Sequence, residues 1–144
     1  MSGELNRLIK IKNIVDDVSP SFCLAKWTQV TLHLHNGRTH SCHHPRTHLV
    51  PLDELEADPS ALHNTKYKKE QRQKMLNGER PEECQYCWNV EDLKGYKDNT
   101  FFSDRITKSG SNWSLSKLKE ITDDPTANIN PSYVEVSFSN LCNF

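Results

Sequence analysis

The clearest pattern of apolar and polar positions lies between residues 27 and 42. Apolar residues alternate with polar ones along Val30, Thr31, Leu32, His33, Leu34 and His35. This is the period of a strand with one buried face. Asn36 and Gly37 follow, a pair typical of a type I′ hairpin turn because both residues tolerate positive φ, and residues 38–41 are the predicted return strand. The hairpin places Cys23, just before it, near Cys42, at its end.

A second pattern predicts a helix over residues 60–77. Lysine, glutamate, glutamine, arginine, methionine and leucine fill most of this stretch, and all are good helix formers. Asn77 and Gly78 are typical of a helix end, and Pro81 follows shortly after. The helix therefore ends shortly before Cys84.

Weaker patterns cover the remaining chain. Residues 1–19 fit either one strand or a short amphipathic turn, and residues 92–110 have the composition of a loop. Ser114 is a candidate N-cap for a short helix over residues 115–121. Residues 133–138 alternate like a strand. The predicted fold class is therefore α+β, with a small cysteine-bearing module built from the hairpin and the following helix.

Composition limits the size of the core. Hydrophobic residues make up 35% and charged residues 26% of the 144 positions, so a metal or disulfides would help to stabilise so thin a core. The net charge of −1 argues against general binding to nucleic acid or anionic membranes, and the basic residues 66–80 are interpreted as a solvated helix face. We find neither a signal peptide nor a long apolar run, and expect a cytoplasmic protein.

The cysteines carry the strongest chemical signal. Cys84 and Cys87 are separated by two residues, and the hairpin adds Cys23 and Cys42. In a reducing compartment, clustered cysteines indicate metal ligands rather than disulfides. A helix precedes Cys84, which is unlike the strand–helix junction of thioredoxin motifs. Four thiolates suit either a tetrahedral zinc ion or a [4Fe–4S] cluster, and incidental buried thiols are the remaining alternative.

Histidines near the cysteines leave further alternatives open. His43 and His44 adjoin Cys42, and either one could replace a cysteine in a Cys₃His zinc site of a structural interaction domain. The other histidines are His33, His35, His40, His48 and His63. The first three are interpreted as one exposed polar face, since no carboxylate cluster is nearby in sequence. The last two have no predicted partner.

The order of these features resembles a known family of domains. Cys23, Trp27-Thr28, the alternating strand and the second cysteine resemble the opening of SPASM and twitch domains, the auxiliary iron–sulfur modules of radical S-adenosylmethionine (SAM) enzymes. The resemblance continues to Gly78 and Pro81 in a G-x-x-P-x-x-C-x-x-C pattern, followed by the acidic Glu91. It implies that one auxiliary [4Fe–4S] cluster, structural or electron-transferring, is ligated by Cys23, Cys42, Cys84 and Cys87.

A second resemblance covers the last residues, which read EVSFSNLCNF. They are similar to the first barrel strand of a radical SAM core, ending on the first cysteine, Cys142, of its C-x-x-x-C-x-x-C motif. The arrangement resembles twitch-type proteins of bacteriophages. Only one of the three ligands of the SAM cluster is present, so we expect no catalytic residues here and no catalysis by this chain alone. SAM, a second [4Fe–4S] cluster and the substrate would belong to a longer parent, whose C-terminal core is the expected partner.

These resemblances predict four regions. Residues 1–22 are a lead-in, residues 23–95 the twitch- or SPASM-like module, residues 96–131 a linker with a short helix, and residues 132–144 the start of a truncated radical SAM core. Neither a membrane nor a nucleic acid is an expected partner.

Overall fold

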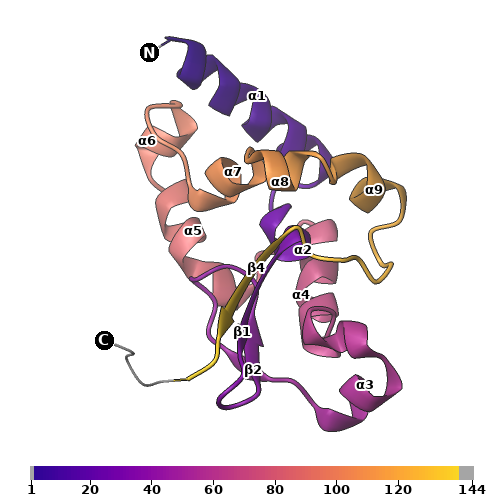
Figure 1. The fold of residues 1–144 in the computed structure, drawn as a ribbon. Coiled ribbons are helices and arrows are strands. Elements are labelled where there is room, and N and C mark those ends of the chain that lie inside the picture. Colours follow the sequence, from indigo (N-terminus) through magenta and orange to yellow (C-terminus); the bar gives the residue numbers. More distant parts are fainter. Residues whose placement is uncertain (1, 140–144) are drawn as a thin grey trace.

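A mixed four-stranded sheet and a series of mostly short helices make up the fold of residues 2–139, the part of the chain that the computed structural model describes (Figure 1). The predicted α+β class is confirmed at this level. The helices are α1 (Ser2–Val18), α2 (Ala25–Thr28), α3 (Leu52–Ala57), α4 (Lys66–Leu76), α5 (Gln85–Glu91), α6 (Lys94–Lys97), α7 (Asp104–Ser109), α8 (Asn112–Leu115) and α9 (Leu118–Asp123). The 3₁₀ turns are η1 (Pro59–Leu62) and η2 (Glu82–Cys84), and the strands are β1 (Gln29–His33), β2 (Arg38–His40), β3 (His48–Leu49) and β4 (Tyr133–Ser137).

The sheet has the strand order β3-β2-β1-β4. Strands β1 and β2 pair antiparallel, with Thr31 opposite His40, which confirms the predicted hairpin. Strand β4 pairs parallel to β1, with Glu135 opposite Thr31. The predicted C-terminal strand is thus present over Tyr133–Ser137 and joins the hairpin, while residues 140–144, including Cys142, lie outside the described residues.

The hairpin turn differs from the prediction. Four residues, 34–37, connect the strands, and of these only Gly37 has a positive φ, +70°. A type I′ turn requires positive φ at both central residues, so the predicted turn type is wrong. Gly37 N–H instead donates to His33 O at 2.9 Å, and the Asn36 side chain accepts from Arg38 N–H at 3.1 Å.

The N-terminal residues form a single helix, α1, so both predictions for residues 1–19, a strand and a short turn, are wrong. Leu8, Ile11 and Val15 recur at a spacing of three to four residues, which places them on one helix face. Ile11 and Val15 are buried and Leu8 packs against the same core. Helix α1 contacts α7, so the helix face is defined by a partner far along the chain.

The helix predicted over residues 60–77 is divided. Its first turn is η1, and α4 starts anew after Thr65, whose hydroxyl caps the helix by accepting from Lys68 N–H at 3.1 Å. The predicted end is confirmed, with Gly78 at φ +78°. The solvated-face interpretation is wrong for Lys68 and Arg72, which are 0% and 3% exposed.

The region from residue 92 to residue 123 is more helical than predicted. Residues 92–110, expected to be loop, contain α6 and α7. The single helix expected over residues 115–121 is instead two, α8 and α9. Ser114 lies within α8 rather than at an N-cap, and its buried hydroxyl is 2.7 Å from Thr28 Oγ1. Contacts between side chains of these short helices and distant segments therefore determine where the helices form.

In the core, residues from helices near both ends of the chain pack around the segment that follows Pro20. Its largest fully buried side chains include Trp27, Trp88, Phe22, Leu24 and Met75. Cys84 and Cys87 belong to the same buried cluster, and Cys23 packs against it. In the part of the chain that is described, no helix has the length and apolar character to cross a membrane.

Candidate metal centre

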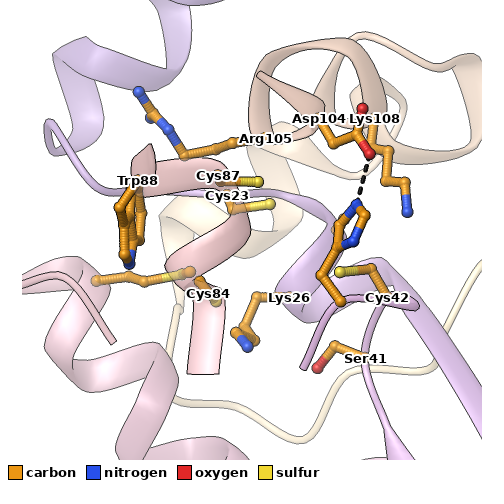
Figure 2. A pocket seen from close by; sticks show the side chains of 13 residues that line it. Cys23, Lys26, Ser41, Cys42, Cys84, Cys87, Trp88, Asp104, Arg105 and Lys108 are labelled. Atoms are coloured by element: carbon orange, nitrogen blue, oxygen red, sulfur yellow. Dashed lines mark hydrogen bonds and ion pairs between the residues drawn. The ribbon is translucent and has the colours of Figure 1, made fainter. Parts of the chain in front are cut away.

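Cys23, Cys42, Cys84 and Cys87 line one cavity, although they come from separate segments. Cys23 precedes α2, Cys42 follows β2, Cys84 ends η2, and Cys87 lies in α5. Figure 2 shows the sulfurs of Cys23 and Cys87 side by side, with the sulfur of Cys42 turned toward them from the other side of the cavity. The four cysteines are free thiols. The four cysteines that the sequence groups into one site therefore line the same cavity.

Local sequence explains how the two later cysteines are held. Pro81 precedes η2, and its carbonyl accepts from Trp88 Nε1 at 2.7 Å. This bond spans the turn that carries Cys84 and Cys87 and ties it to the buried indole. Because η2 runs directly into α5, the two cysteines lie about one helical turn apart.

Three apolar side chains complete part of the cavity wall. Ala25, Met75 and Trp88 line it together with the thiols. The free space is about 20 Å³, room for about one water molecule. Cys84 and Cys87 are only 8% and 7% exposed, so a group bound by the thiols would be shielded from solvent.

Two buried cations also line the cavity, Lys26 and Arg105. Lys26 Nζ forms an ion pair with Glu83, and both side chains are almost completely buried. Arg105 pairs with Glu91 through Nε and Oε2 at 2.8 Å and also donates to Phe22 O at 2.8 Å. The acidic residue noted after the last cysteine thus holds a cation against the site.

Burial dominates the protonation of the thiols. It raises the pKa of Cys84 to about 12, although nearby Lys26 opposes the shift. Burial, with a smaller contribution from neighbouring thiols, also raises the pKa of Cys23 and of Cys87. Cys23, Cys84 and Cys87 are therefore protonated at neutral pH when nothing is bound, and a bound metal would have to displace their protons.

Lys26 keeps its charge despite its burial. Burial alone would lower its pKa, but Cys84 in its thiolate form and the carboxylate of Glu83 more than reverse this effect and hold the pKa above its usual value. A permanent positive charge therefore lies beside the thiols.

One of the two histidines considered as ligands lies at this cavity. His44 lines it, with Nε2 2.6 Å from Asp104 Oδ2 and its ring stacked on Tyr86 at 3.7 Å between centroids. His43 instead lies near Glu135, with Nε2 3.2 Å from Oε1. Of these two histidines, His44 is therefore the one beside the thiols, and Asp104 holds its ring in place.

The side chains of residues 2–139 include no group of three or more histidine, cysteine, aspartate or glutamate residues arranged to hold a single metal ion. In a tetrahedral zinc site with Zn–S bonds of about 2.3 Å, the sulfurs are about 3.8 Å apart. The four thiols share a cavity but do not meet the geometry of a single-ion site.

The histidine predictions have mixed outcomes. His40 is 8% exposed, so the exposed polar face is wrong for this residue. A carboxylate, Glu135, does lie near the histidines because β4 pairs with β1. His48 and His63 have partners that the sequence did not indicate, Thr65 Oγ1 at 2.9 Å and Trp27 O at 2.6 Å.

Lys26 and Arg105 were missed by the sequence analysis. Lys26 carries a weak signal, because it lies within an otherwise apolar stretch, FCLAKW. Arg105 carries none, since it lies in a polar region predicted to be loop. Its position depends on the packing of α7 against α1 and α2.

Comparisons with known proteins identify no relative. The sequence matches no protein-family model, no curated protein and no solved structure. The family resemblance therefore stays a prediction that depends on the quoted motifs alone.

Proposed function

We propose that Cys23, Cys42, Cys84 and Cys87 together hold one [4Fe–4S] cluster. The observation that supports this most is the convergence of four thiols from four segments on one mostly apolar cavity. Four cysteine thiolates are the usual ligand set of such a cluster. The donor atoms present therefore fit the group in type and number, and the cavity walls would have to move apart to admit it, because the free space is about 20 Å³.

The resemblance, rather than the structure, favours a cluster over a single zinc ion. Four cysteine thiolates suit either group, and among residues 2–139 no set of three or more ligands is arranged around a single ion. A structural zinc-binding interaction domain is the competing function, and the experiment below distinguishes the two.

Residues around the cavity would offset the negative charge of the cluster and shield the cluster from solvent. Lys26 and Arg105 place positive charge at the cavity wall, which offsets the negative charge of a thiolate-ligated cluster. His44 and Tyr86 stack at the side of the cavity. When bound, the cluster would tie the four segments together and could accept and release an electron.

Following the resemblance, the proposed role is that of an auxiliary cluster in a radical SAM enzyme. The SAM-binding cluster would use Cys142 together with ligands and a core that this chain does not supply. We accordingly expect no formation of 5′-deoxyadenosine from SAM and a strong reductant by this 144-residue polypeptide alone. Catalytic formation that is lost in Cys142→Ala would contradict this part of the proposal.

Anaerobic reconstitution with iron and sulfide tests the ligand assignment. We expect broad visible absorption and about four irons and four sulfides per chain, as in a [4Fe–4S] cluster. A colourless protein containing one zinc ion, which has a full d shell, would instead support the structural zinc domain. A protein that retains neither metal would contradict both.

Single substitutions test whether the four thiols act as one site. Cys84→Ala and Cys87→Ala should each abolish stable iron binding and reduce the helix and sheet content measured by circular dichroism, because binding to the folded state contributes to folding. Cys142→Ala is the matched control and should retain the auxiliary cluster. Equal losses in Cys142→Ala and Cys84→Ala would contradict the assignment.

A further inference from the structure

A second group of potential metal ligands lies on the sheet, outside the lining of the cysteine cavity. His33 on β1 and His40 on β2 face each other, with their Nε2 atoms 3.1 Å apart. His43 lies beside His40, with 6.2 Å between the ring centroids. Glu135 on β4 approaches His43 Nε2 to 3.2 Å.

The strand register brings these residues to one face of the sheet. Thr31 is paired with His40 on one side and with Glu135 on the other, and directly paired residues project to the same face. His33 is two residues after Thr31 and shares that face. Thr31 is 5% exposed, and its hydroxyl lacks a hydrogen-bond partner within residues 2–139. A buried hydroxyl without a partner is costly, so a bound water or ligand at this face would be favoured.

Hydrogen bonds prepare the two facing nitrogens for a metal. His40 Nδ1 lies 3.1 Å from Pro45 O, and because a carbonyl only accepts, Nδ1 carries the hydrogen. In the neutral ring, Nε2 then has a free lone pair. This is the usual arrangement of a metal-bound histidine, whose second nitrogen donates to a carbonyl or carboxylate. His33 Nε2 donates its hydrogen to His40 Nε2 and would retain it only while no metal is bound.

We propose that His33 and His40 bind a divalent transition-metal ion, such as Zn²⁺, through their Nε2 atoms. Zn–N bonds of about 2.0–2.1 Å at tetrahedral angles separate two nitrogens by about 3.3 Å, close to the observed 3.1 Å. The hydrogen between the nitrogens moves to Nδ1 of His33, so that no net proton is lost from either ring.

The third ligand comes from His43 or Glu135. As placed, these side chains do not complete a group of three around one point. The side chain of His43 is 54% exposed, so it can rotate toward His40 at little cost, and Glu135 is then released from it. Water fills the remaining position and can supply the partner that Thr31 Oγ1 lacks.

Nitrogen-15 NMR of the imidazole rings tests the proposal directly. Zn²⁺ is added to the full chain in excess of what the cysteine thiols can bind. The Nε2 resonances of His33 and His40 should shift together and saturate, whereas those of His48, which bonds to Thr65, should stay unchanged. Nε2 resonances of His33 and His40 that do not move at saturating Zn²⁺ would overturn the proposal, whatever happens at the cysteines.

Variants provide an independent measurement. His33→Gln and His40→Gln should each weaken binding of this second Zn²⁺ by at least tenfold. Mutation of a residue that only hydrogen-bonds to a ligand typically lowers metal affinity 10–100-fold, and loss of the ligand itself should lower it at least as much. His48→Gln is the matched control and should bind as the unmodified chain does. Circular dichroism checks that each variant folds. If His40→Gln does not fold, His33→Gln, at the less buried position, is the variant to measure. Unchanged affinity in a folded His33→Gln variant would contradict the site.

Discussion

Two buried regions of this protein both contain buried cations but differ in whether carboxylates pair with them. At the cysteine cavity, Lys26 is paired with Glu83 and Arg105 with Glu91, and all four side chains are largely inaccessible to solvent. The carboxylates stabilise the cations, and the pKa of Arg105 is raised because bonding to Glu91 outweighs the effect of burial. Charge at the cavity is therefore permanent.

Within residues 2–139, no carboxylate forms an ion pair with Lys68 or Arg72, the two residues on the inner face of α4. Lys68 Nζ donates to Thr39 Oγ1 at 3.2 Å, and Arg72 donates to neutral acceptors that include Asn64 Oδ1 at 2.7 Å and His63 O at 3.3 Å. Burial, reinforced by neighbouring cations, lowers the pKa of Lys68 to about 6, and burial lowers that of Arg72 to about 9.

The difference shows that burial alone does not decide whether a lysine is charged. Lys26 and Lys68 are 2% and 0% exposed, yet at pH 7 the first is charged and the second is mostly neutral. What differs is the partner, the Glu83 carboxylate for Lys26 and the Thr39 hydroxyl for Lys68. The charge that persists is the one that would serve a negatively charged cluster.

The largest expected effect comes from removing a carboxylate at the cavity. Glu91→Gln leaves Arg105 buried with Asp16 as its remaining carboxylate, and should lower the free energy of unfolding by about 3 kcal/mol, as expected when a buried pair is broken. Asp92→Asn is the control, since it breaks only the exposed pair with Arg80 and should cost less than about 1 kcal/mol. Urea denaturation measures both. Equal losses would mean that the buried pair is worth no more than a surface pair.

Substituting the two buried lysines sharpens the comparison. Lys26→Met removes the cation paired with the buried Glu83 carboxylate, which then keeps the hydrogen bond from Tyr67 at 2.9 Å. This variant should lower the free energy of unfolding by about 2 kcal/mol. Lys68→Met removes an amine that takes up a proton at pH 7 only when the chain unfolds, so this variant should not lose stability at pH 7 and should gain it. Thermal unfolding at pH 7 compares the two variants. A larger loss in Lys68→Met than in Lys26→Met would reverse our interpretation.

The third expected effect is a change in the pH dependence of stability. The pKa of Lys68 is about 6 in the folded chain and 10.5 in the unfolded one. Between these values the unfolded chain binds the extra proton, so stability should rise with pH, by up to about 1.4 kcal/mol per pH unit. Lys68→Met should remove this slope between pH 6.5 and 9. An unchanged slope, measured by urea denaturation across this range, would show that Lys68 stays charged when buried.

Acid should also destabilise the fold through two histidines. Burial, with nearby cations such as Lys68, lowers the pKa of His48 to about 4 and that of His63 to about 2. Below about pH 6.5 the unfolded chain takes up protons that the folded chain refuses, so stability falls as pH falls. His48→Gln should reduce the loss between pH 6.5 and 4, measured by the same denaturation series.

The sequence by itself determined the features that depend on neighbours along the chain. The hairpin, the end of α4, the last strand and the meeting of Cys23 with Cys42 follow from alternation, turn residues and the C-x-x-C spacing. Tertiary structure decided the rest. Helix α1 is defined by its packing on α7, Lys26 and Arg105 owe their positions to distant carboxylates, and the parallel pairing of β4 with β1 brings Glu135 to the histidines. A local pattern records which residues prefer a helix, strand or turn, but a buried charge or a ligand group depends on partners that only the folded chain brings together.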